Sequence, residues 1–151
     1  MFKWFGKVNF SPFTKVADFA QHLKDGFIMA SRCKKCGATS FPPRADCGKC
    51  MSPEFELNEI SGKGKLHTYT EIVAAPTGFE DVVPYTVGVV DLEEGGRLLA
   101  WLGESIKKDE IEIGMDVQIV PQIFDEIEDI KVYYSIEKPG TTWSKGKSAM
   151  E

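Results

Sequence analysis

Four cysteines, all that the chain contains, lie in two Cys-x-x-Cys pairs within eighteen residues. The pairs are Cys33–Cys36 and Cys47–Cys50, and a ten-residue loop separates them. Each pair can place two thiolates on one side of a tight turn. Two such turns facing each other supply four sulfurs at about 2.3 Å around one tetrahedral Zn²⁺. Four protein ligands leave no open position for water or substrate, so the zinc is expected to be structural.

Two disulfides, unrelated buried cysteines and a redox Cys-x-x-Cys pair are the alternatives. A redox role for one pair would leave the second pair unexplained, and residues 1–10 contain no apolar run of secretory-signal length. We therefore expect a reducing cytoplasm, which favours zinc thiolate over a disulfide. No apolar run approaches the roughly 20 residues of a membrane span, so no membrane segment is expected.

The residues before the cysteines predict an aromatic arm followed by one short helix. The arm contains five aromatic residues, and Asn9 and Pro12 argue against a helix there; the five are Phe2, Trp4, Phe5, Phe10 and Phe13. This arm could pack back on its own domain or dock on a partner, and we expect a contact with a partner or a second copy of the chain rather than self-packing. Residues 14–25 predict a helix with an apolar stripe, with Thr14 as its N-cap and Gly26 after its end; the stripe is Val16, Phe19, Ala20 and Leu23.

The second half of the chain predicts a small β-barrel. Runs rich in β-branched and aromatic residues predict five strands, at 65–74, 83–92, 97–102, 115–124 and 130–136, with a polar connection at 104–113 that includes a helical turn. Gly62 and Gly64 predict a turn or a bulge before the first of these strands, and Pro121 is expected to interrupt the fourth. The strand count and the long connection favour an OB-fold over an SH3-like barrel or an open sheet. The predicted fold is mainly β, with an arm and helix (1–30), a rubredoxin-like zinc ribbon (31–57), a five-stranded OB-fold barrel (58–137) and a flexible tail (138–151).

Charge is distributed unevenly along the chain, whose net charge is −5. Residues 1–70 carry eleven Lys or Arg and six Asp or Glu, a net +5, whereas residues 71–151 carry seven and seventeen, a net −10. The basic half could meet phosphates or an acidic partner, or it could simply be a solvated ribbon surface.

Taken together, several motifs resemble one known family over roughly residues 14–124. They are Cys33-Lys-Lys-Cys36-Gly37, Phe41-Pro-Pro-Arg44, Cys47-Gly-Lys-Cys50, Ser61-Gly-Lys-Gly64, Val83-Pro-Tyr85, Glu94-Gly-Gly-Arg97 and Ile113-Gly-Met-Asp-Val117. The combined order is similar to the thiolase-associated family with a zinc ribbon and an OB-fold, known as domain of unknown function 35. The aromatic start is also similar to that of the small subunits of benzoylsuccinyl-CoA thiolases.

The resemblance implies a non-catalytic accessory subunit that docks on a thiolase-fold catalytic subunit and helps to shape its acyl-CoA site. A two-plus-two heterotetramer is expected, since thiolases are usually dimers. The family's zinc ligands correspond to Cys33, Cys36, Cys47 and Cys50. Nearby cations are candidates for the CoA phosphates, since guanidinium and ammonium groups suit phosphate; they are Arg32, Lys34, Lys35, Arg44 and Lys49. The acidic run Asp125–Asp129 departs from the family pattern.

No catalytic residue is expected in the chain itself. If metal occupies the cysteines, the only other candidate bases are His22 and His67, and neither has a nearby Ser or Cys in a triad-like pattern. A single-stranded nucleic-acid binder is the alternative function, with Tyr69 and Tyr85 as stacking residues, although the acidic barrel half opposes it. A scaffold protein without a ligand is a third possibility.

Overall fold

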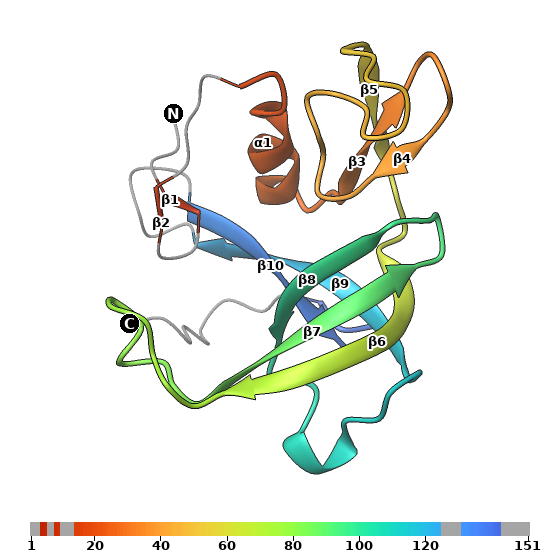
Figure 1. The fold of residues 1–151 in the computed structure, drawn as a ribbon. Helices are drawn as coiled ribbons and strands as arrows, with labels where there is room; N and C mark the ends of the chain where they lie inside the picture. The colour runs from red at the N-terminus through yellow and green to blue at the C-terminus, as the bar shows by residue number, and fades with distance from the viewer. Residues whose placement is uncertain (1–3, 6–7, 10–13, 125–130, 143–151) are drawn as a thin grey trace.

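The computed structural model describes residues 4–5, 8–9, 14–124 and 131–142 (Figure 1). The elements are β1 (Trp4–Phe5), β2 (Val8–Asn9), α1 (Asp18–Lys24), β3 (Met29–Cys33), β4 (Thr39–Ser40), β5 (Phe55–Glu59), β6 (Lys63–Ile72), β7 (Tyr85–Leu92), β8 (Arg97–Leu102), the 3-10 helix η1 (Lys108–Glu110), β9 (Asp116–Phe124) and β10 (Lys131–Glu137). The fold is mainly β, as the sequence predicts.

Strands β6 to β10 form a closed barrel. The antiparallel hairpins β6–β7 and β7–β8 lead to β10, which pairs in parallel with β8, and β9 pairs with both β10 and β6. This order closes the sheet on itself with the connectivity of an OB-fold, and the connection before β9 contains the predicted helical turn, η1. The predicted five-stranded OB-fold barrel is confirmed.

Alternating side chains of these strands fill the barrel. Leu66, Val90, Ile119 and Ile136 are almost completely buried. Gly88 lies among them because an added Cβ would come within 3.1 Å of methyl groups on three surrounding side chains. The interior is therefore packed with side chains and leaves no room for a ligand at this point.

The helix α1 is shorter than expected. It begins at Asp18 with Ala17 as its N-cap, whereas Thr14 accepts a hydrogen bond from the Val16 N–H in the preceding turn. Its end is as predicted: Gly26 has φ +90°, its N–H bonds to the Leu23 carbonyl, and the next N–H bonds to the His22 carbonyl. This is a Schellman C-cap.

The ribbon forms a separate three-stranded sheet, β4–β3–β5, above the barrel (Figure 1). Its core joins that of the barrel through three aromatic rings from different elements. Phe41 of the ribbon lies 5.7 Å from Phe19 of α1 and 5.3 Å from Tyr134 of β10, measured between ring centroids. Since the helix also contacts β3, β9 and β10, ribbon and barrel share one hydrophobic core.

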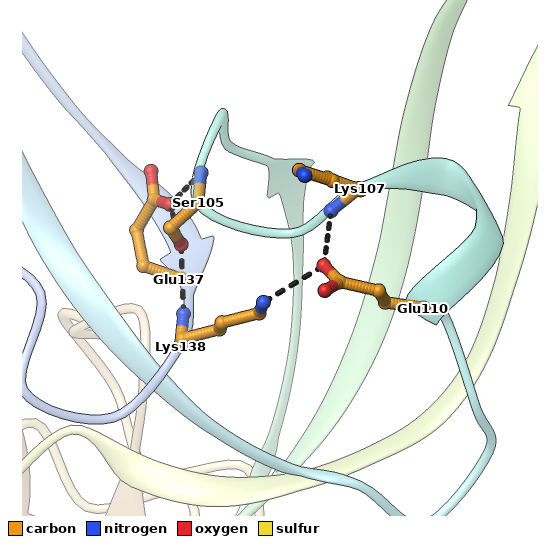
Figure 2. Close-up of polar contacts among 5 residues, drawn as sticks. All are labelled: Ser105, Lys107, Glu110, Glu137 and Lys138. Carbon is orange, nitrogen blue, oxygen red and sulfur yellow. Dashed lines mark hydrogen bonds and ion pairs between the residues drawn. The ribbon is translucent and has the colours of Figure 1, made fainter.

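A buried carboxylate fixes the loop that follows β8 (Figure 2). Glu137 is 4 % exposed, and its Oε2 accepts hydrogen bonds from the Ser105 N–H at 3.0 Å and from the Ser105 hydroxyl. Its Oε1 accepts from Ser135, which in turn accepts from Gln122. Each oxygen of this buried carboxyl group therefore has a donor.

Lys138 continues the same polar network outside the barrel (Figure 2). Its N–H donates to Ser105 Oγ at 2.9 Å, and its Nζ lies 2.7 Å from Glu110 Oε2. Glu110 also accepts a hydrogen bond from the Lys107 N–H at the start of η1. The first residue of the predicted tail is thus tied to the connection before β9.

Two features of the strands differ from the sequence-based predictions, the position of a bulge and the effect of a proline. A turn or a bulge is predicted at Gly62 and Gly64, and the register shift in this sheet falls instead at His67, between Leu66 and Thr68. Gly62 instead takes a left-handed φ of +69° just before β6. Pro121 was expected to interrupt the fourth barrel strand, but β9 runs through it and stays in register with Tyr134. Proline is tolerated in a strand where its missing N–H has no ladder partner.

Parts of the predicted arm, loop and tail lie outside the described residues. Backbone is described at β1 and β2, where β1 adds to β10 in parallel, which the sequence did not predict. Phe2, Phe10, Phe13, Trp143 and the acidic run 125–129 are not described. Within the described part of the chain, no helix combines the length and apolar character needed to span a bilayer.

Candidate metal centre and adjoining cleft

The four cysteine sulfurs gather at one end of the ribbon sheet. Cys33 ends β3 and Cys36 follows in a tight turn, while Cys47 and Cys50 form a second turn that faces the first. All four Sγ atoms lie within 4.8 Å of one another. Each of these two turns, in which two residues separate a pair of cysteines, is termed a knuckle.

The two knuckles have the same backbone design. In the first, the Gly37 N–H bonds to the Cys33 carbonyl at 2.9 Å, and Gly37 has φ +71°. In the second, the Met51 N–H bonds to the Cys47 carbonyl at 2.9 Å, and Met51 has φ +60°. Glycine favours this left-handed conformation because it lacks a Cβ, but in the second knuckle a methionine holds it.

The distances between sulfurs fit a tetrahedral ion and not disulfides. Cys33 and Cys50 are 3.6 Å apart, and Cys36 and Cys47 are 3.5 Å apart, whereas a disulfide requires about 2.05 Å. A tetrahedron with metal–sulfur bonds of about 2.3 Å has edges of about 3.8 Å. The four cysteines therefore fit a structural metal site, and Zn²⁺ is the ion proposed from their chemistry.

Hydrogen bonds and the crowding of the sulfurs shift the pKa values of these thiols in opposite directions. The N–H groups of Cys50 and Lys49 lower the pKa of the Cys47 thiol to about 6. The Ser52 N–H lowers the pKa of Cys50, but burial and the three neighbouring sulfurs outweigh it and raise that pKa to about 12. Four thiolates this close together repel one another, and a bound cation removes that repulsion.

A basic cleft adjoins the second knuckle. Its volume is ≈ 280 Å³, and its walls come from the ribbon loop, the second knuckle and the turn before β8. Three cationic residues line it: Arg44, Lys49 and Arg97. Gly48 belongs to the same wall, where an added Cβ would lie 3.1 Å from Arg44 Nη1. Ribbon and barrel therefore each contribute positive charge to one concave surface.

Only two of the five predicted phosphate-binding candidates lie in this cleft. Arg44 and Lys49 do so, whereas Arg32 lies on β3 and Lys34 and Lys35 lie in the first knuckle, all three exposed and outside the cleft. Arg97 was not among the candidates because it is 48 residues beyond Lys49 in the sequence, and only the tertiary fold brings the two together. Its position after a double-glycine turn gave no signal of this proximity.

Arg97 also belongs to a surface ion-pair cluster on the barrel. Its Nε lies 2.5 Å from Asp91 Oδ1, and His67 Nδ1 lies 2.8 Å from Asp91 Oδ2. The Arg97 hydrogen bond, aided by His67, lowers the pKa of the Asp91 carboxyl. His67 is thus a strand residue whose ring nitrogen has a carboxylate partner.

The geometry agrees with what sequence models of known families recognise. Residues 20–56 match the rubredoxin-like zinc ribbon domain of ChsH2, and residues 58–122 match its C-terminal OB-fold domain. A "DUF35 domain-containing scaffold protein" from Methanocaldococcus jannaschii is 39% identical over 102 residues, covering 66% of this chain and 72% of the relative. The chain belongs to the DUF35 family.

Other relatives of this DUF35 chain are named as parts of larger enzymes. The "benzoylsuccinyl-CoA thiolase subunit BbsA" from Thauera aromatica is 36% identical over 76 residues, which is 50% of this chain and 51% of that subunit. A solved chain titled "Ltp2-ChsH2(DUF35) aldolase" superposes with a TM-score of 0.64 and 28% identity, covering 81% of this chain and 92% of that one. The predicted family membership is thus confirmed.

Proposed function

We propose that this chain is the accessory subunit of a thiolase-type acyl-CoA enzyme and that it docks on the catalytic subunit. The observation that carries the proposal is similarity to one protein named as a thiolase subunit and to a solved chain titled as an aldolase, the latter over four fifths of this chain. The chemistry belongs to the partner in this proposal. A two-plus-two assembly in the cytoplasm is the expected arrangement.

The cysteine cluster fits a subunit without a nucleophile of its own. Thiolase chemistry needs a reactive thiolate, and all four cysteines of this chain face one another within 4.8 Å. A structural Zn²⁺ bound by the four sulfurs would occupy each of them. The ion would contribute folding free energy to a ribbon too small to fold on its own, on the order of 10 kcal/mol.

The basic cleft gives the chain a part in holding the CoA ester. Arg44, Lys49 and Arg97 present two guanidinium groups and one ammonium group, which suit phosphate oxygens. A volume of ≈ 280 Å³ is at the lower limit for a complete small-molecule pocket, so it suits a phosphate or diphosphate group. The remainder of the CoA ester would then lie on the catalytic subunit.

Affinity purification of the tagged chain from its native host, followed by mass spectrometry, tests the subunit assignment. A thiolase-type chain in near-equal amount is the expected result. Recovery of the chain alone, or of nucleic acid that nuclease removes, would overturn the assignment.

Charge reversal in the recovered complex tests the cleft. Arg44→Glu and Lys49→Glu are expected to weaken acyl-CoA binding by about 10-fold or more, because each reversal removes a phosphate contact and adds repulsion. Lys34→Glu is the matched control, since it makes the same charge change on the same ribbon outside the cleft. Equal affinity for all variants would refute the proposal that the basic cleft binds the CoA phosphates, but it would not contradict the subunit assignment.

A further inference from the structure

The outer face of β7 and β8 is apolar although it points away from the barrel core. Strand alternation puts Gly88 and Val90 of β7 and Leu98 and Ala100 of β8 inside the barrel, so the residues that alternate with them point outward. Strand register aligns these outward residues across the sheet, with Val89 beside Leu99 and Val87 beside Trp101. We call this surface the β7–β8 outer face; it consists of Tyr85, Val87, Val89, Leu99 and Trp101.

Two features of this face are unusual for a solvent-exposed sheet. Leu99 is 62% exposed at its centre. Next to it, Trp101 stacks on Tyr85 with ring centroids 4.5 Å apart and an interplanar angle of 26°. Stacked aromatic rings lose little side-chain entropy on binding, and Trp and Tyr are enriched among the residues that dominate interface energies.

The charged groups around the face pair with one another. Asp91 and Arg97, at the ribbon end of β7 and β8, bond to each other. On β6, Lys65 lies opposite Asp91 and pairs with Asp116. The charges at these margins are therefore compensated within the chain, so the complementary surface is uncharged and apolar at its centre.

Among the described residues, no helix or further strand packs on this face, and Phe79 of the loop before β7 adds its ring to Trp101, with centroids 6.4 Å apart. The helix α1 packs on β9, β10 and β3, at the side of the barrel that carries the ribbon (Figure 1). The strands β6 and β8 are the neighbours of β7 along its hydrogen-bonded edges, and they contribute to the same sheet. In OB-folds the corresponding strands commonly form the ligand face, and here that face lacks the cations that a phosphate backbone requires.

We propose that the β7–β8 outer face is the docking surface for the catalytic subunit, with the Trp101–Tyr85 pair and Leu99 inserted against an uncharged apolar patch of that subunit. This inference rests on the proposed function and adds the surface through which it operates. Paired charges at the margin and an aromatic, aliphatic centre match the composition of stable subunit interfaces.

The test uses the wild-type chain and two variants with the purified thiolase-type chain that the wild type recovers. Leu99→Glu places a charge at the centre of the face, and Ile113→Glu places the same charge at a comparably exposed residue, 68% exposed, in the loop before β9. Leu99→Glu is expected to weaken binding by about 30-fold or more, and Ile113→Glu by less than about 3-fold. Both variants should keep the wild-type circular dichroism spectrum, because neither side chain is buried.

A photoreactive benzophenone amino acid at position 99 identifies the occupant directly, without depending on the stability of a variant. A crosslink to the thiolase-type chain supports the proposal. A crosslink to a second copy of this chain, or to single-stranded nucleic acid, overturns it. Equal binding of Leu99→Glu and wild type overturns the surface assignment alone, whereas failure of the wild type to recover any thiolase-type chain overturns the proposed function as well.

Discussion

Gly103 and Glu137 allow a quantitative test of the packing around the buried carboxylate. A Cβ added at Gly103 would lie 2.8 Å from Glu137 Oε2 and closer still to Cδ and Oε1, distances that real Cβ atoms essentially never show. The carboxylate would have to leave its site and lose its hydrogen bonds from Ser105 and Ser135. Gly103→Ala is therefore expected to destabilise the chain strongly.

The expected loss of folding free energy has two parts. Overpacking typically costs about 1–3 kcal/mol, and a lost hydrogen bond to a buried charged group costs about 1.5–3 kcal/mol. Together they give about 4 kcal/mol, which for a chain of this length lowers the Tm by roughly 8–16 °C at about 2–4 °C per kcal/mol. Thermal and urea unfolding followed by circular dichroism, with Zn²⁺ in constant excess, measure this change.

A double-mutant cycle shows whether the clash with Glu137 is the cause. Glu137→Ala removes the carboxylate, and it should itself cost about 2 kcal/mol by leaving Ser105 and Ser135 without an acceptor. In that background Gly103→Ala has nothing to displace, so it should cost less than about 1 kcal/mol, which gives a coupling of about 3 kcal/mol. Additive effects of the two substitutions would refute the packing argument.

Three further predictions concern the ribbon and the ion-pair cluster. Met51→Gly is expected to raise the Tm by about 2–4 °C, because the substitution removes about 1 kcal/mol of backbone strain from an exposed residue at φ +60°. Gly37→Ala should introduce similar strain and lower the Tm by a similar amount. A lower Tm for Met51→Gly would contradict this reasoning. Removing metal with a chelator is expected to lower the Tm of the barrel as well as the ribbon, and an unchanged barrel transition would show that the two do not share a core. The lowered pKa of Asp91 means that its pairing with Arg97 stabilises the fold above the unfolded-state pKa of 3.8 and that this contribution is lost as pH falls through the folded-state pKa. Arg97→Gln should therefore raise the Asp91 carboxyl titration midpoint seen by NMR and weaken the fall in stability under acid.

Local patterns in the sequence were sufficient for the barrel and for the cysteine cluster. Strand β8, from Arg97 to Leu102, begins and ends where alternation and the double-glycine turn predict. The four cysteines come together because each pair is held by its own turn and the spacing is local. Such features depend on neighbours within a few residues, and these are visible in the sequence.

Features that depend on distant contacts were missed. The sequence does not predict strand β5 (Phe55–Glu59), although Phe55 and Leu57 alternate with polar residues, because its partner β3 lies more than twenty residues earlier. The parallel addition of β1 to β10 joins the two ends of the chain, and no local signal indicates it. Arg97 enters the basic cleft for the same reason, through the approach of the β7–β8 turn to the ribbon.

The contact of Phe19, Phe41 and Tyr134 has a consequence for how a partner would bind. These rings join ribbon, helix and barrel in one core, so the basic cleft and the β7–β8 outer face keep a fixed distance and orientation. Once a partner engages one surface, its second contact forms at a high effective concentration and without the entropic cost of ordering a linker. Phe41→Ala would loosen this connection and lower that effective concentration, so it should weaken assembly by no more than the loss of one surface contact does.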